Sequence, residues 1–374
     1  MTLILLLILL VYIVTMAQLI AGFDKIKTFH GKAIPPKTFF AIVVPFRNES
    51  TNLPILLESI KNLNYPKELF EIILIDDFSE DDSVRQIYNW RMENGVFQTT
   101  LLENIRLSGS PKKDAISRAI PIIKNEWLVT TDADCVVPEN WLLTLDQYIQ
   151  QHDVEMIVGS VVYDTKKSFL HHFQQLDLMS LQGATIGSFG MGLGFMCNGA
   201  NFCYTKTLFE QLHGFKGNNK MASGDDVFLL QKAMKKHSEQ VHFLKSKETI
   251  VHTKPVSSWA ELFSQRVRWA SKTSAYQSVF GKDLAVIVFS GNLAIVLAFC
   301  LMPYAFSSWS YLLLSFSLKF ITDFILLYKT NRFLRKKRMG YLLLSSVLYP
   351  FFCVTVAVFS WFGSYEWKGR KFKN

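Results

Sequence analysis

The chain has 374 residues, of which 49% are hydrophobic and only 19% charged, and its formal net charge is +9. This composition excludes disordered, collagen-like and disulfide-scaffold proteins. Soluble enzymes usually carry about a quarter charged residues, so the low charged fraction indicates a membrane protein. Residues 282–374 hold 12 Lys and Arg against 3 Asp and Glu, a surplus that equals the whole net charge. Positive charge beside apolar segments is typical of cytoplasmic membrane flanks, and we expect no nucleic-acid partner.

The first 21 residues are apolar over about the length of a membrane-spanning helix. The segment lacks a positively charged start and is longer than the apolar core of a signal peptide, which favours an uncleaved anchor over a cleaved signal. We therefore assign residues 1–22 to an N-terminal transmembrane anchor. Four lysines follow, so the chain should emerge on the cytoplasmic side: Lys25, Lys27, Lys32 and Lys37.

Residues 23–281 are expected to form a cytoplasmic α/β domain. Short β-branched runs bounded by turn residues alternate with helical stretches such as 49–63 and 112–123. This alternation predicts a mostly parallel sheet covered by helices. The predicted strands are 41–45, 71–76, 127–132 and 156–162.

Acidic residues follow two of these strands. Asp76 and Asp77 end one strand, and Asp132 and Asp134 flank Ala133 after another. In an open α/β sheet, the carboxyl ends of the strands form the ligand crevice. Two carboxylates at positions i and i+2 can share one divalent cation, while a nucleotide diphosphate supplies further oxygen ligands. A simple acidic turn is the alternative for either cluster alone.

Two more polar clusters lie nearer the C-terminus. Asp225 and Asp226 stand at the start of a predicted amphipathic helix, where they could cap the helix or one could act as a general base. The second cluster lies in residues 264–272. If this stretch is helical, Gln265, Arg268 and Trp269 share one face. That face could simply be buried, or it could offer a guanidinium to phosphate oxygens and an indole to a sugar ring.

The order of these motifs resembles that in the membrane-bound family 2 glycosyltransferases, the group that contains cellulose, chitin and hyaluronan synthases and ceramide glucosyltransferase. The likeness runs from Phe39 to Lys272. It implies a GT-A nucleotide-sugar-binding domain with a mostly parallel sheet, attached to N-terminal and C-terminal transmembrane helices. The motifs are Pro45-Phe46-Arg47-Asn48-Glu49, Asp76-Asp77, Asp132-Ala133-Asp134, Gly199-Ala200-Asn201, Gly224-Asp225-Asp226 and Gln265-Arg266-Val267-Arg268-Trp269.

The resemblance also implies which residues bind the donor. Asp134, with Asp132, would hold Mg²⁺ or Mn²⁺ on the diphosphate, and Asp132 would lie near the donor. Lys113 would be the basic residue near the nucleotide. The other residues implied in donor binding are Pro45, Arg47, Glu49, Asp76 and Asp77.

The remaining motifs are implied in catalysis. Asp226 matches the acid that deprotonates the acceptor hydroxyl, whereas many synthases have Thr-Glu-Asp where this chain has Gly-Asp-Asp, so the choice between Asp225 and Asp226 stays open. Gln265, Arg268 and Trp269 match the QxxRW motif beside the diphosphate and the acceptor.

The sequence thus predicts an inverting, metal-dependent glycosyltransferase that moves a sugar from a nucleotide sugar, expected to be a UDP-sugar, to a membrane-associated lipid or lipid-linked glycan. A single base and no second carboxylate nucleophile imply inversion. The alternatives are a processive polysaccharide synthase, which shares QxxRW, and a catalytically inactive membrane scaffold. We expect a multi-pass protein of a bacterial inner membrane that acts in cell-envelope polysaccharide or glycolipid synthesis.

Residues 282–374 are expected to form a membrane region with two or three transmembrane helices, drawn from 285–307, 308–328 and 341–362. Three crossings would leave the basic tail outside, against the positive-inside rule. We therefore expect an even number of crossings and a cytoplasmic C-terminus. The segment that carries Lys319 and Asp323, or the one that carries Ser290-Gly291-Asn292, would then not cross.

Overall fold

The computed structural model describes residues 2–165, 168–217, 221, 224–301, 307–362, 364–367 and 370–373. The chain divides into two compact units. The sheet unit comprises Lys27–Asp164 and Met196–Lys254, and the helix unit comprises Met1–Ile26, Thr165–Phe195 and Pro255–Asn374. The domain boundaries expected after residues 22 and 281 stay a prediction.

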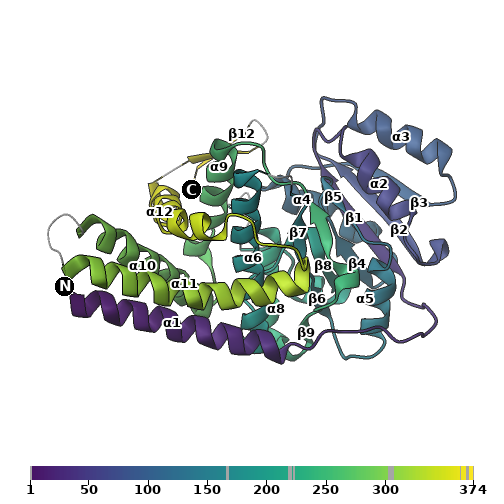
Figure 1. The fold of residues 1–374 in the computed structure, drawn as a ribbon. Coiled ribbons are helices and arrows are strands. Elements are labelled where there is room, and N and C mark those ends of the chain that lie inside the picture. The colour runs from purple at the N-terminus through teal and green to yellow at the C-terminus, as the bar shows by residue number, and fades with distance from the viewer. Residues whose placement is uncertain are drawn as a thin grey trace. The chain divides into compact units, whose positions relative to one another are not determined.

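A seven-stranded sheet with the order β3-β2-β1-β4-β8-β6-β9 forms the centre of the sheet unit (Figure 1). Strand β8 is antiparallel to both of its neighbours, and the other neighbouring pairs are parallel. The predicted mostly parallel α/β fold is therefore confirmed. The strands are β1 (Phe40–Phe46), β2 (Phe70–Asp76), β3 (Gln98–Glu103), β4 (Trp127–Thr130), β6 (Met156–Val158), β8 (Phe202–Thr205) and β9 (Val241–Phe243).

A second sheet has the order β5-β10-β7. The stretch 156–162, predicted as one strand, divides at Gly159 and contributes β6 to the large sheet and β7 to the small one. The side chain of Asn201 explains the break, because it fills the space where a side chain at position 159 would lie and it bonds the carbonyl of Ser160. The strands of this sheet are β5 (Cys135–Val136), β7 (Val161–Tyr163) and β10 (Val251–Thr253).

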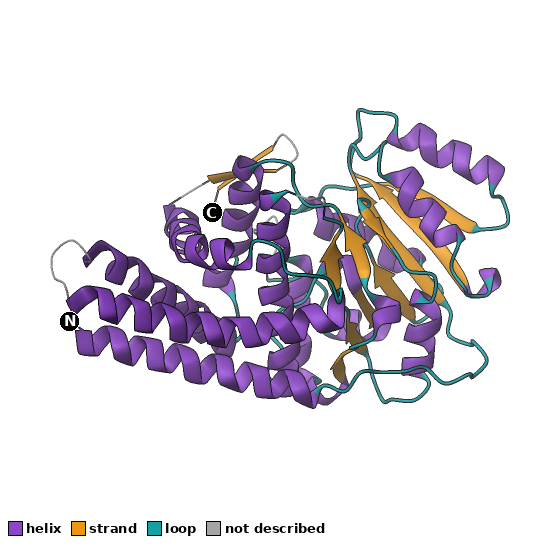
Figure 2. Cartoon of the chain, viewed as in Figure 1, coloured by secondary structure: helices purple, strands orange, loops and turns teal. Residues whose placement is uncertain are grey.

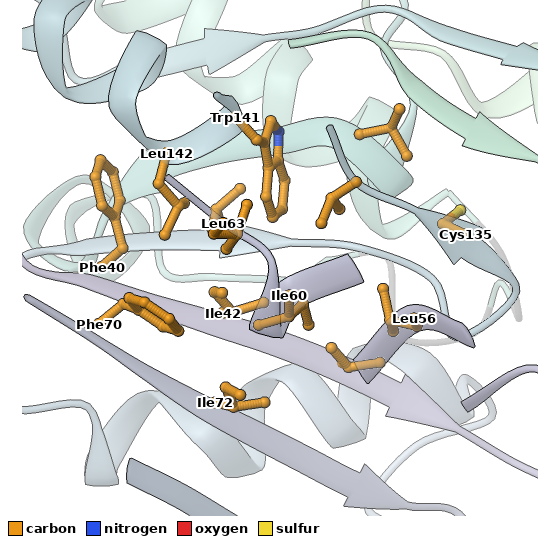
Figure 3. Close-up of a cluster of buried hydrophobic side chains, with 14 of the residues drawn as sticks. Phe40, Ile42, Leu56, Ile60, Leu63, Phe70, Ile72, Cys135, Trp141 and Leu142 are labelled. Carbon is orange, nitrogen blue, oxygen red and sulfur yellow. The ribbon is translucent and has the colours of Figure 1, made fainter. Parts of the chain in front are cut away.

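Helices cover the large sheet, and a hydrophobic core lies between the sheet and α2 and α5 (Figure 3). Every second residue of β1, starting at Phe40, belongs to this core, as the two-residue period of a strand requires. Ala41 and Val43 are also fully buried, so both faces of β1 are covered, as in other parallel sheets. The helices of the sheet unit are α2 (Leu53–Lys61), α3 (Ser83–Glu93), α4 (Pro111–Ala119), α5 (Trp141–Ile149), α7 (Lys206–Gln211) and α8 (Asp225–Lys236).

The helix unit consists mainly of long helices (Figure 2). Within the described part of the chain, α1, α10, α11 and α12 are long and apolar enough to cross a membrane, which is consistent with a membrane protein. The segment with Ser290-Gly291-Asn292 lies inside the continuous helix α10. The unit comprises α1 (Thr2–Lys25), α6 (Phe169–Gly190), α9 (Trp259–Ala270), α10 (Val279–Leu301), α11 (Ser307–Leu334), α12 (Leu342–Phe362), β11 (Ser364–Trp367) and β12 (Arg370–Lys373).

Two ion pairs involve charged residues of the apolar helices α1 and α11. Lys319 Nζ lies 2.5 Å from Asp323 Oδ2 one turn away on α11, and Tyr12 of α1 donates its hydroxyl to Asp323 Oδ1 at 2.6 Å. Nearer the ends of the same two helices, Lys329 contacts Asp24 at 2.8 Å. The residue numbers of these contacts increase together along both helices, so α1 and α11 run parallel.

Candidate active site

The first two predicted motifs lie at one edge of the large sheet. In the parallel register of β1 and β2, Pro45 pairs with Ile75 and Phe46 pairs with Asp76. The N–H of Asp77 then donates to the carbonyl of Phe46 at 2.9 Å. Because β4 is parallel to β1 and pairs with it, its acidic turn leaves the sheet at the same edge.

Arg47 joins the turns that follow β1 and β2. Its Nη1 donates to the carbonyl of Asp77 at 2.8 Å, and its Nη2 lies 2.7 Å from the carboxylate of Glu80. Glu49 accepts a hydrogen bond from Asn52 Nδ2 at 2.6 Å. The predicted donor-binding residues Arg47 and Glu49 therefore help to order the loop that closes this edge of the sheet.

The two acids after β2 differ in their surroundings. Asp77 is 5% exposed and accepts hydrogen bonds from Asn104 Nδ2 at 2.7 Å and from Arg106 Nη1 at 2.8 and 2.9 Å. Asp76 accepts the N–H of Ser79 at 3.0 Å. Sequence reasoning missed Asn104 and Arg106, although they directly follow β3, a parallel strand whose end lies at the same edge.

Charged side chains from three separate segments meet around Lys112. Its Nζ lies 2.6 Å from Asp132 Oδ1 and 3.6 Å from Asp225 Oδ2. Asp226 Oδ2 accepts the N–H of Gly199 at 2.8 Å. Burial lowers the pKa of Lys112, but the charges of the three aspartates outweigh it and raise that pKa above its ordinary value. Lys112 is therefore an ammonium at neutral pH, and it forms ion pairs with Asp132 and Asp225.

The sequence resemblance indicated Lys113, but the lysine that bonds Asp132 is its neighbour Lys112. Lys113 is 2% exposed, donates to the carbonyl of Met221 at 3.0 Å and lies 5.3 Å from the ring centroid of Phe228. Both lysines stand in the first turn of α4. Adjacent residues of a helix point about 100° apart, and only the packing of α4 shows which one faces the acids.

For the two acids at the start of α8, the sequence allows helix capping or a general-base role, and the general-base role stays a prediction. Gly224 precedes the helix with φ of 84°, a left-handed conformation that glycine adopts without steric cost. Asp226 Oδ1 accepts the N–H of Val227 at 2.7 Å, and carboxylates are favourable at this end of the helix dipole. Asp226 thus bonds a backbone N–H in the first turn of α8, while its neighbour Asp225 lies near Lys112.

The acids between β4 and β5 fit a divalent cation by the chemistry of their donors. Asp134 lines a small pocket with Asn52, His252 and Lys254. Asp132 and Asp134 offer carboxylate oxygens, which Mg²⁺ and Mn²⁺ prefer. Among the described residues, no three His, Cys, Asp or Glu side chains gather to hold a metal. Two carboxylates completed by diphosphate oxygens are a usual arrangement for Mg²⁺.

Asn201 of the Gly199-Ala200-Asn201 motif has a structural place. It is 3% exposed, and its Nδ2 donates to the carbonyls of Ser160 at 2.8 Å and Thr249 at 2.7 Å. Its Oδ1 accepts the indole N–H of Trp141 at 3.0 Å. One side chain thus joins the segments that lead to β7, β10 and α5.

We expect Asn201→Ala to destabilise the protein, because it leaves three buried polar groups without this partner. Each such group costs roughly 1–3 kcal/mol. The measurement is the thermal unfolding midpoint of the detergent-solubilised protein, with Asn64→Ala as the control, since Asn64 makes an exposed hydrogen bond to Asn140. An unchanged midpoint for Asn201→Ala would contradict this assignment.

The predicted QxxRW residues lie in the helix unit. Gln265, Arg268 and Trp269 stand on α9, as predicted, and all three are partly exposed. Ser258 caps the helix by accepting the N–H of Glu261 at 3.2 Å.

Comparison with known proteins agrees with this geometry. A profile of the family described as "Glycosyltransferase like family 2" matches residues 35–272. Glycosyltransferase GlyG of Streptococcus pneumoniae serotype 4 is 23% identical over 243 residues, which cover 61% of this chain and 79% of that protein. The beta-monoglucosyldiacylglycerol synthase of Trichormus variabilis is 26% identical over 132 residues, which cover 35% of this chain and 28% of that protein.

Among solved structures, the mannosyltransferase PcManGT from Pyrobaculum calidifontis, in complex with GDP-Man and Mn²⁺, is similar over 96% of this chain and 98% of its own. The TM-score is 0.61 and the sequence identity is 14%. At this identity the likeness concerns the fold, and it agrees with the GT-A architecture of the sheet unit.

Proposed function

Because the chain belongs to the family 2 glycosyltransferases, which act on nucleotide sugars, we propose that it is an inverting, metal-dependent enzyme whose acceptor is a membrane-associated lipid or lipid-linked glycan. The observation that carries this proposal is the meeting of Asp132, Asp225 and Asp226 around Lys112. These residues come from three segments, and their charges suit a donor with a diphosphate and an acceptor that must lose a proton.

In this mechanism, Asp226 accepts the proton of the acceptor hydroxyl while the oxygen attacks the anomeric carbon. A single base and a single displacement invert the configuration at that carbon. Lys112 keeps the nearby carboxylates ordered and adds positive charge where the diphosphate leaves. Asp134, with Asp132, would hold Mg²⁺ or Mn²⁺, and that ion would neutralise charge on the leaving diphosphate.

The membrane helices and the relatives support a membrane-associated acceptor. One relative is named for the synthesis of a glucosyldiacylglycerol, and its aligned segment covers 28% of its length. Another, from Bacillus spizizenii, is named a poly(ribitol-phosphate) beta-glucosyltransferase; it is 29% identical over 32% of this chain and 19% of its own length. We propose a UDP-sugar as the donor and cell-envelope glycolipid or polysaccharide synthesis as the setting.

The test incubates the purified full-length protein with labelled nucleotide sugars, Mn²⁺ and a bacterial membrane-lipid extract, and follows label into lipid by mass spectrometry. Mass spectrometry of membrane lipids and glycans, with and without the gene, then gives the product in cells. One added sugar on a lipid supports the proposal. A ladder of long glycans would instead favour a processive synthase, and no transfer from any donor would overturn the proposal.

The orientation in the membrane is part of this proposal. With the sheet unit in the cytoplasm, α1 ends on the inner side of a bacterial inner membrane, and α11, parallel to α1, ends there too. Only five residues separate α10 from α11, and the two helices contact each other, so α10 runs outward. In this arrangement, the side on which the C-terminus lies depends on whether α12 crosses the membrane.

We base the proposal that α12 does not cross on its contacts with α9; α12 also packs against α10. Phe352 and Phe359 of α12 contact Phe263 of α9, at ring-centroid distances of 6.4 and 5.4 Å. Helix α9 carries charged residues that are costly in hydrocarbon, so we place both helices at the membrane surface.

We therefore expect a reporter fused after Asn374 to lie in the cytoplasm, with α10 and α11 as the two crossings after the sheet unit. This proposal replaces the expectation from the sequence, in which one of those two segments does not cross. The positive charges of the tail agree with this placement. The measurement pairs a reporter that is active only inside the cell with one that is active only outside, and fusions after Lys254 serve as the internal standard. Activity of the outer reporter after Asn374 would show that α12 crosses.

A further inference from the structure

The QxxRW motif contains a buried residue at a position that the motif leaves unspecified. Arg266 is 5% exposed, whereas Gln265, Arg268 and Trp269 on the same helix are partly exposed. A buried guanidinium is costly unless it is paired and hydrogen-bonded. Its partners therefore indicate what it does.

Two of the three named motif side chains touch Arg266. Its Nη1 donates to Oε1 of Gln265, and its guanidinium carbon lies 4.2 Å from the ring centroid of Trp269. A planar guanidinium can donate hydrogen bonds at its edge and stack on an aromatic ring with its face at the same time. Arg266 therefore contacts both neighbours at once, one through its edge and the other through its face.

Arg266 is itself held from another helix. Its Nε donates to Asp177 Oδ2 of α6 at 2.5 Å, and Asp177 is 6% exposed. Helix α6 packs closely against α1, because the backbones of the two helices are in direct contact. A methyl group on Gly22 of α1 would overlap the carbonyl of Gly187, and one on Gly190 would overlap the carbonyl of Gly22.

We propose that Arg266 is a positioning residue for glycosyl transfer, and that Asp177 connects the QxxRW motif through Arg266 to the α6–α1 helix pair. The proposal rests on the proposed function, in which Gln265 and Trp269 act beside the diphosphate and the acceptor. The first transmembrane helix then has a role beyond anchoring, because it supports the helix that carries Asp177.

The first test is Arg266→Lys in the full-length protein. Lysine keeps a positive charge for Asp177 but loses both the planar stack on Trp269 and the edge that bonds Gln265. We expect kcat to fall about 10- to 100-fold, the range that small misplacements of catalytic groups produce, while the thermal midpoint stays within a few degrees of wild type. The matched control, Lys329→Met, breaks the Lys329–Asp24 ion pair of the same unit and should leave kcat unchanged.

The second test asks whether Asp177 affects catalysis only through Arg266. Asp177→Asn keeps the shape of the side chain but loses its charge, so it should also lower kcat. If Asp177 acts only through Arg266, the double variant Arg266→Lys/Asp177→Asn should have the kcat of Arg266→Lys alone. Independent losses that multiply would overturn the link between the two residues.

The outcomes separate this inference from the proposed function. A wild-type protein that transfers no sugar contradicts the proposed function. A wild-type protein that transfers sugar, together with an Arg266→Lys variant of equal kcat, overturns only the positioning role. A loss of kcat that matches the loss of folded protein would also overturn it, because it would show a purely structural ion pair.

Discussion

Asp226→Asn is expected to lower turnover roughly 10²- to 10⁴-fold, which is the usual contribution of general base catalysis. The amide has nearly the same shape, and its carbonyl oxygen can still accept the hydrogen bond that Gly199 donates. It cannot take the proton of the acceptor hydroxyl. Binding of the nucleotide sugar should therefore persist while kcat falls, as measured by donor titration and by initial rates.

Asp225→Asn is the matched comparison. Asp225 is 8% exposed and lies 3.6 Å from Lys112, so its replacement should disturb the charge balance of the site without removing the base. A dead Asp225→Asn variant beside a near-normal Asp226→Asn variant would show that the base is the neighbouring residue. Activity in both variants would show that the site is misplaced.

Asp134→Ala is expected to abolish metal-dependent binding of the donor. A hard cation between carboxylate and diphosphate loses its protein ligand in this variant, and alanine offers no oxygen in its place. The measurement is donor binding at increasing Mn²⁺ concentration, together with activity. Full activity of the wild type in excess EDTA would contradict the metal assignment.

Asp82→Ala is the control for this variant. Asp82 is an exposed acid in the turn before α3, and it pairs with Arg85 at 2.7 Å. Surface ion pairs of this kind contribute little. The control should therefore match the wild type in donor binding and in metal dependence.

Much of the local structure follows directly from the sequence. The run AIVVP lies in β1 and EIILID lies in β2, because β-branched runs between turn residues suit buried strands. Proline explains where two predicted helices differ from the observed ones. Pro54 stands in the first turn of α2, and Pro121 ends the α-helical part of the second stretch, which continues as a short 3₁₀ helix.

The candidate site was only partly predictable. The acids after β2 and β4 and at the start of α8 could be found, because the ends of parallel strands and of helices are marked by local sequence. The ammonium that joins them could not, since Lys112 meets Asp132 across 20 residues of chain and Lys113 has the same local pattern. Likewise, nothing near Asp77 in sequence indicates that Asn104 and Arg106 bond it.

The sequence alone specified the elements whose signals are local: apolar periodicity for strands and helices, length and apolarity for the four candidate spans, and motif order for the family. Packing specified which side chains meet. It buried Arg266 against Asp177, 89 residues away, and gave Asn201 a structural place that its motif does not indicate. The physical reason is that hydrogen bonds and ion pairs act over a few ångströms, and distant segments reach that range only after the chain folds.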